Sequence, residues 1–67
     1  MRKLKGAEIR NALKNGDIIY VEESNFIEKR LYRLKNNNLE YSDDNLTWST
    51  SKLGVEDLEK YICVKIK

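Results

Sequence analysis

The chain is poor in the residues that usually stabilise or anchor a small protein. Its 67 residues include no proline, no histidine, one cysteine and three glycines. One cysteine cannot close an intrachain disulfide, and without histidine or a second cysteine a structural zinc site is not expected. No apolar run approaches the ~18 residues of a membrane-spanning helix. The protein must therefore be stabilised by its hydrophobic core or by association.

Composition indicates one small globular domain over residues 1–67. Hydrophobic residues make up 40% of the chain and charged residues 36%, which is typical of a folded domain rather than a disordered one. A core of this size rarely supplies more than about 3–5 kcal/mol. We therefore expect a homo-oligomer.

Cysteine usage and the amino end predict where the protein works. Cys63 lies in an apolar run, "YICVKI", and is expected to be a small buried residue in a reducing compartment. The start "MRKLKGAEIR" has basic residues but no apolar stretch of a signal peptide. These features predict a cytoplasmic protein with no membrane partner.

Charge is nearly balanced but unevenly distributed. The net charge is +2, with basic residues concentrated at the amino end and around 29–35. Such blocks usually form solvated faces. The acidic block Glu56, Asp57 and Glu59 is a candidate protein interface, whereas nucleic-acid binding by the basic segments is the least favoured alternative.

Residues for catalysis are scarce. The chain has no histidine, which is the usual general base near neutral pH. Glu22 and Glu23 are adjacent in an expected strand, so they point to opposite faces. Cys63 has no histidine partner, and the glycines form no phosphate-binding loop. We predict a protein that is not an enzyme and has no cofactor or metal ion.

The segment "GAEIRNALKNG" predicts a helix. Ile9, Ala12 and Leu13 fall on one face at helical spacing. Gly6 is the expected N-cap, and Gly16 supplies the left-handed residue that ends the helix.

The remaining segments predict mainly strands. "DIIYVEES" is rich in β-formers, 26–34 is predicted to be a strand rather than a helix, and "NNN" a hairpin loop before "LEYS". "LTWS" is expected to be a further strand with Leu46 and Trp48 on one face, followed by a short helix "GVEDLEKY" and a strand "YICVKIK". The expected fold is α+β: a small, mainly antiparallel sheet of four to five strands against the N-terminal helix, with a short second helix before the last strand.

Aromatic and arginine side chains are interleaved along these strands. Such a combination can stack on a flat ring and bind a phosphate by bidentate hydrogen bonds. Trp48 is surrounded by hydroxyl residues, and we expect its ring to anchor the closing helix and strand first and to contact a ligand second. The candidate ligand-binding residues are Tyr20, Arg30, Arg33, Trp48 and Ser51.

The order of these motifs resembles a known family of very small phage-encoded proteins. The pattern G-x-E-I-x-x-A-L-x-x-G is followed by a strand, a tyrosine-bearing hairpin, a W-x-x-S element and a closing D-L-x-x-aromatic-x-x-V. The matching positions are Gly6, Glu8, Ile9, Ala12, Leu13, Gly16, Trp48, Ser51, Asp57, Leu58, Tyr61 and Val64. This pattern resembles the second Thoeris anti-defence family, whose members sequester host immune signalling nucleotides.

The resemblance implies a phage or mobile-element accessory protein that acts in the host cytoplasm and sequesters a signalling nucleotide. The alternative is an anti-CRISPR-like inhibitor that binds a host nuclease or another defence protein. A concave site that combines Arg30, Arg33 and Trp48 would favour sequestration. A flat acidic face would favour the protein inhibitor.

Overall fold

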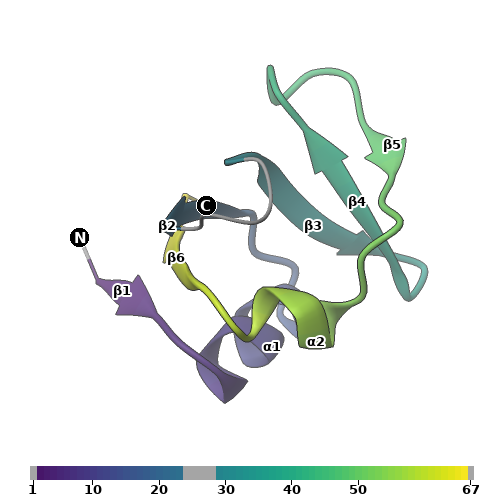
Figure 1. Ribbon diagram of the computed structural model, residues 1–67. Coiled ribbons are helices and arrows are strands. Elements are labelled where there is room, and N and C mark those ends of the chain that lie inside the picture. Colours follow the sequence, from purple (N-terminus) through teal and green to yellow (C-terminus); the bar gives the residue numbers. More distant parts are fainter. Residues whose placement is uncertain (1, 24–28, 67) are drawn as a thin grey trace.

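The computed structural model describes residues 2–23 and 29–66, which form an α+β domain (Figure 1). The strands are β1 (Lys3–Leu4), β2 (Ile19–Glu23), β3 (Leu31–Lys35), β4 (Asn38–Ser42), β5 (Ser49–Thr50) and β6 (Ile62–Lys65). The helices are α1 (Ala7–Lys14) and α2 (Val55–Leu58). The predicted fold class is confirmed.

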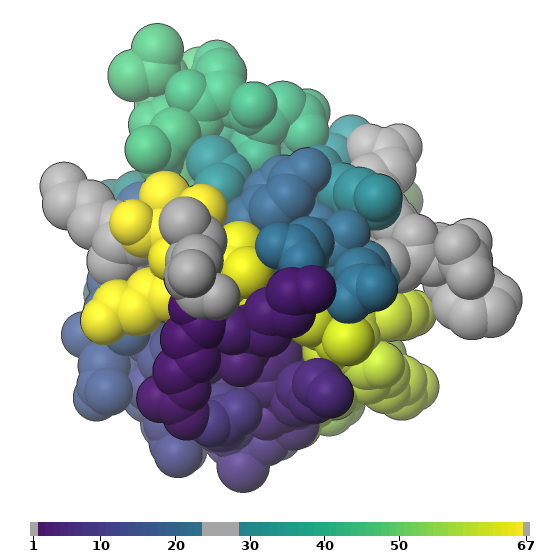
Figure 2. All heavy atoms as spheres, turned by 90° about the vertical axis from the view of Figure 1, so that its left-hand side faces the viewer, coloured from purple at the N-terminus to yellow at the C-terminus, as the bar shows by residue number. Residues whose placement is uncertain are grey.

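The strands form one antiparallel sheet in the order β1-β6-β2-β3-β4-β5. Both helices lie together on the same side of the sheet (Figure 1). The last strand is inserted between β1 and β2, so the two ends of the chain lie side by side, as Figure 2 also shows. The edges of the sheet are therefore β1 and β5.

Helix α1 covers the core as its sequence predicts. Ile9, Ala12 and Leu13 are buried, and Gly6 is the N-cap. Gly16 has a φ of 89°, and the Gly16 and Asp17 amides donate to the Leu13 and Ala12 carbonyl oxygens. This hydrogen-bond pattern ends a helix when the following residue is left-handed, which glycine adopts without strain.

The hairpin between β3 and β4 follows from asparagine chemistry. Asn36 and Asn37 have φ values of 53° and 66°, and Lys35 pairs with Asn38 across a two-residue loop. Positive φ at both loop residues is the type I′ requirement, which asparagine tolerates better than most residues. The predicted "NNN" turn and the pairing of this strand with Leu39 and Tyr41 are confirmed.

Helix α2 is short and is fixed at both ends by side chains. The Gly54 amide donates to Asp57 Oδ2 at 2.8 Å, which caps the first turn. Leu58 is fully buried, and Glu59 accepts from Arg10 Nη2 at 2.9 Å and Arg10 Nε at 3.2 Å. This bidentate pair fastens α2 to α1.

Three elements differ most from the sequence predictions. Strand β1 was not predicted, because two residues in a charged segment carry no periodic pattern and are ordered by pairing with β6. Strand β3 begins at Leu31 rather than residue 26; Lys29 and Arg30 have no strand assignment, and 26–28 lie outside the described residues. The predicted strand over 46–49 is wrong: residues 43–47 form a bend, and β5 begins only at Ser49.

Candidate functional site

A pocket of about 370 Å³ opens beside β5, on the side of the sheet where Tyr32 and Tyr41 pair. Cross-strand partners share a sheet face, so the two tyrosines form one aromatic wall. Tyr32 is a core residue, while Tyr41 and Leu53 pack against the core, which makes this wall rigid. The pocket is lined by Arg30, Tyr32, Tyr41, Thr50, Ser51, Lys52 and Leu53.

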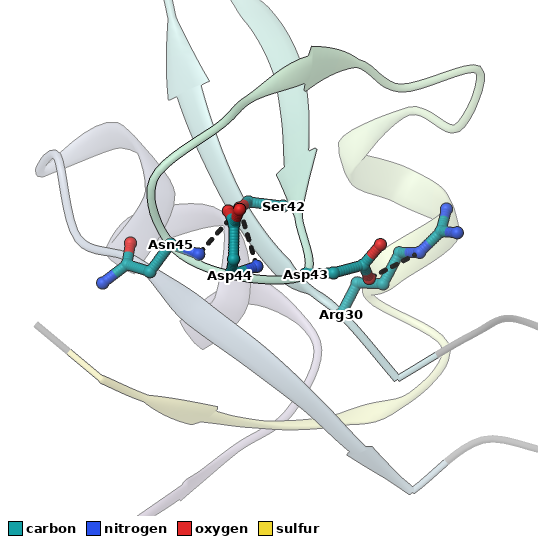
Figure 3. Close-up of polar contacts among 5 residues, drawn as sticks. All are labelled: Arg30, Ser42, Asp43, Asp44 and Asn45. Carbon is teal, nitrogen blue, oxygen red and sulfur yellow. Dashed lines mark hydrogen bonds and ion pairs between the residues drawn. The ribbon is translucent and has the colours of Figure 1, made fainter.

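Arg30 lies at the boundary between this pocket and a second hollow of about 220 Å³. Its guanidinium carbon is 4.4 Å from the centre of the Tyr41 ring, a cation–π distance. Arg30 Nε also donates to Asp43 Oδ1 at 3.0 Å (Figure 3). The planar cation is therefore held in place from two directions.

The second hollow is bounded by a turn that Ser42 and Asp44 fix (Figure 3). The buried Ser42 Oγ accepts from the Asn45 amide at 2.8 Å and donates to Asp44 Oδ1. Asp44 Oδ1 also accepts from the amides of Thr47 at 2.9 Å and Leu46 at 2.8 Å. These bonds, the Thr47 amide first, lower the pKa of Asp44, and they bend the chain where the sequence predicts a strand.

Arg33 and Trp48 lie on the opposite face of the sheet from this pocket. Arg33 pairs with Glu40, one residue away from the Tyr32–Tyr41 pair, and successive strand residues point to opposite faces. Arg33 Nε donates to Glu40 Oε1 at 2.9 Å, and its guanidinium carbon lies 4.2 Å from the Trp48 ring centre. The structure therefore brings Arg30 and Ser51 together but places Arg33 and Trp48 elsewhere.

Trp48 does not anchor the closing helix and strand. Trp48 is half-buried. Among the described residues, it belongs neither to the hydrophobic core nor to the side chains that pack against the core. The bend at 43–47 places its ring against Arg33 instead. The expected packing role is wrong for this reason.

Tyr20 and the acidic residues are apart from the pocket. Tyr20 pairs with Leu31 and Val64 on the central strand β2 and does not line the pocket. Asp57 caps α2, and Glu59 binds Arg10, with its pKa lowered chiefly by that hydrogen bond. Glu56 is exposed. Two of the three predicted interface carboxylates thus have structural partners within the chain.

The candidate ligand-binding residues predicted from the sequence do not include part of the pocket wall, which consists of Tyr32, Tyr41, Thr50, Lys52 and Leu53. One signal was available: a two-residue loop at Asn36–Asn37 places Tyr32 opposite Tyr41 by counting back along both strands. Lys52 and Leu53 follow the last residues of β5, in a bend that carries no periodic pattern.

Comparison with protein-family models, curated protein sequences and solved structures found no match. The geometry of the chain itself is therefore the basis for a functional proposal. Within residues 2–23 and 29–66, no helix has the length and apolarity to cross a bilayer. The same residues contain no group of three His, Cys, Asp or Glu side chains arranged to hold a metal ion.

Proposed function

We propose that this protein is a non-enzymatic binder that captures a small phosphate-bearing molecule with a flat ring in the Arg30–Tyr41 pocket. One observation carries the proposal: a guanidinium held on an aromatic ring lines the same pocket as Ser51 and Lys52. Flat rings stack on tyrosine or guanidinium planes, and phosphate oxygens accept charge-assisted hydrogen bonds. At about 370 Å³ the pocket is within the range of small-molecule sites.

The side chains in the pocket suit binding rather than catalysis. The described lining residues are an arginine, a lysine, two tyrosines, a threonine, a serine and a leucine, with no acidic residue or cysteine. Hydroxyls and cations orient an anion, whereas hydrolysis needs a general base within reach of the attacking group. The chain as a whole contains no histidine to serve as one.

Lys52 is the side chain best suited to bind the anionic group of the ligand. It is exposed, lines the pocket and makes no ion pair with any residue that the structure describes. An ammonium without a partner carboxylate can bind an anion without first breaking an internal pair. Arg30, already oriented by Tyr41 and Asp43, supplies the planar surface.

The biological setting that we propose follows the resemblance noted above: a phage or mobile-element protein that lowers the concentration of a host defence signalling nucleotide. Cys63 is free and buried, which is compatible with the cytoplasm as the place of action. We also propose that the working form is a homo-oligomer. The rival protein-inhibitor function gains less support, since Asp57 and Glu59 have structural partners in the chain.

Isothermal titration calorimetry with linear and cyclic nucleotides and their matched nucleosides tests the proposal. At least one phosphate-bearing compound should bind, and Lys52→Gln should weaken it about tenfold or more, because a hydrogen bond to a charged group is lost. The matched control is Lys35→Gln, an exposed lysine at the β3 hairpin, which should leave affinity unchanged. The proposal is overturned if no nucleotide binds, or if Lys52→Gln and Lys35→Gln lower the affinity equally.

A further inference from the structure

The β5 edge of the sheet is open for pairing with another strand. Glu40 pairs with Thr50, and the Ser51 amide donates to the Leu39 carbonyl oxygen at 2.8 Å. Bonded and non-bonded pairs alternate along an antiparallel ladder, so the Thr50 N–H and C=O point away from β4. Both β5 residues are exposed, and β5 is at the outer end of the strand order (Figure 1).

The two edges of the sheet differ in protection. Lysines are a common means of keeping sheet edges from pairing, and β1 contains Lys3 and is followed by Lys5. By contrast, β5 consists of serine and threonine, with no charge, proline or bulge. The β1 strand therefore has a protective lysine, and β5 has none.

We propose that two copies of this chain associate through an antiparallel β5–β5 pair centred on Thr50. Pairing about a twofold axis makes each Thr50 N–H face the carbonyl oxygen of the partner's Thr50, so the backbone groups are complementary. The proposal deepens the oligomer part of the proposed function and does not depend on the ligand.

The side chains that flank Thr50 are also complementary to themselves. In this register Ser49 of each chain lies opposite the partner's Ser51, so the dimer contains two serine–serine pairs. Trp48 stacks on Arg33 of its own chain and Lys52 lines the ligand pocket, so the pairing uses neither side chain. A second β5 therefore suits this edge better than a strand of unrelated sequence.

Register-specific cross-linking tests this arrangement. Thr50→Cys should form a covalent dimer under mild oxidation, because directly paired residues have Cα atoms about 5.5 Å apart, within disulfide range. Ser49→Cys is the matched control: two copies of residue 49 are offset by two positions, about 7–8 Å, and should not cross-link. The native Cys63 is fully buried and does not compete.

A backbone variant separates pairing from folding. Thr50→Pro removes an N–H that faces away from β4, so analytical ultracentrifugation should show a folded monomer where the wild type is a dimer at micromolar concentration. Ser51→Pro removes the amide that bonds Leu39 and should lower thermal stability instead. A wild type that stays at 7.9 kDa, or equal cross-linking of both cysteine variants, would overturn the proposal. Neither result would affect the calorimetric test of ligand binding.

Discussion

Replacing Trp48 with alanine distinguishes a tryptophan in the core from one on the surface. A core tryptophan loses about 3–5 kcal/mol on truncation. In the structure Trp48 is half-buried, and the guanidinium carbon of Arg33 lies 4.2 Å from the centre of its ring. An exposed cation–π pair contributes about 0.5–1 kcal/mol, and burying half of a large apolar side chain adds roughly 1 kcal/mol. We therefore expect Trp48→Ala to lower the free energy of unfolding by about 2 kcal/mol, less than a core truncation.

Urea unfolding followed by far-ultraviolet circular dichroism is the suitable assay, because the variant loses the only tryptophan and with it the fluorescence signal. Leu58→Ala is the reference for a core truncation, since Leu58 is 0% exposed. Because Leu58 is fully buried, that variant should lose roughly 3–5 kcal/mol, a large part of the stability of so small a domain.

Arg33→Ala and the double variant complete a mutant cycle. The two truncations should be less than additive, because each removes the same cation–π contact. If Trp48→Ala lowers the free energy of unfolding as much as Leu58→Ala, or if the losses at Trp48 and Arg33 add, then Trp48 is not a surface residue that packs on Arg33.

Three further changes have defined outcomes. The pKa of Asp44 is lowered in the folded protein. The carboxylate therefore stabilises the fold above its unfolded pKa of about 3.9, and this stability is lost as pH falls through the folded pKa. In an acid titration, Asp44→Asn should lose less stability below pH ~4 than the wild type. Asn37→Val should destabilise by about 1–2 kcal/mol in thermal melts, because φ is positive there, while Asn37→Gly should not. Burial raises the pKa of the Cys63 thiol to about 11, so thiol reagents should label it only after urea is added; rapid labelling of the native protein would contradict its burial.

Much of the fold is predictable from local chemistry. The spacing of Ile9, Ala12 and Leu13 and the glycine that follows α1 define the helix and its end. The consecutive asparagines define the hairpin, because few other residues adopt two positive φ values in succession. These features depend on neighbours in the sequence.

The parts that were mispredicted depend on contacts between distant segments. Strand β1 exists because β6 pairs with it, which no feature of "KL" reveals. The bend at 43–47 depends on one carboxylate that accepts several amides, although leucine, threonine and tryptophan nearby favour a strand. Local propensity fails there because the Asp44 side chain competes with the strand ladder for the backbone.

The candidate site was half predictable for a related reason. Arg30 and Ser51 were selected for their chemistry, and the pocket contains both. Arg33 was selected on the same grounds, but strand alternation and the Glu40 pairing place it on the other face. The face on which Arg33 lies depends on how β3 pairs with β4. That pairing is set by the length of the loop between the two strands, which composition alone does not determine.

Native mass spectrometry of the protein purified from the cells in which it acts tests the central claim most directly. We expect the wild-type protein to retain a phosphate-bearing small molecule, seen as a discrete added mass, and the Lys52→Gln variant to retain less of it. The Lys35→Gln control should retain as much as the wild type. A wild type that carries no small molecule, or one retained equally by the wild type and Lys52→Gln, would contradict the claim that this pocket captures an anionic ligand.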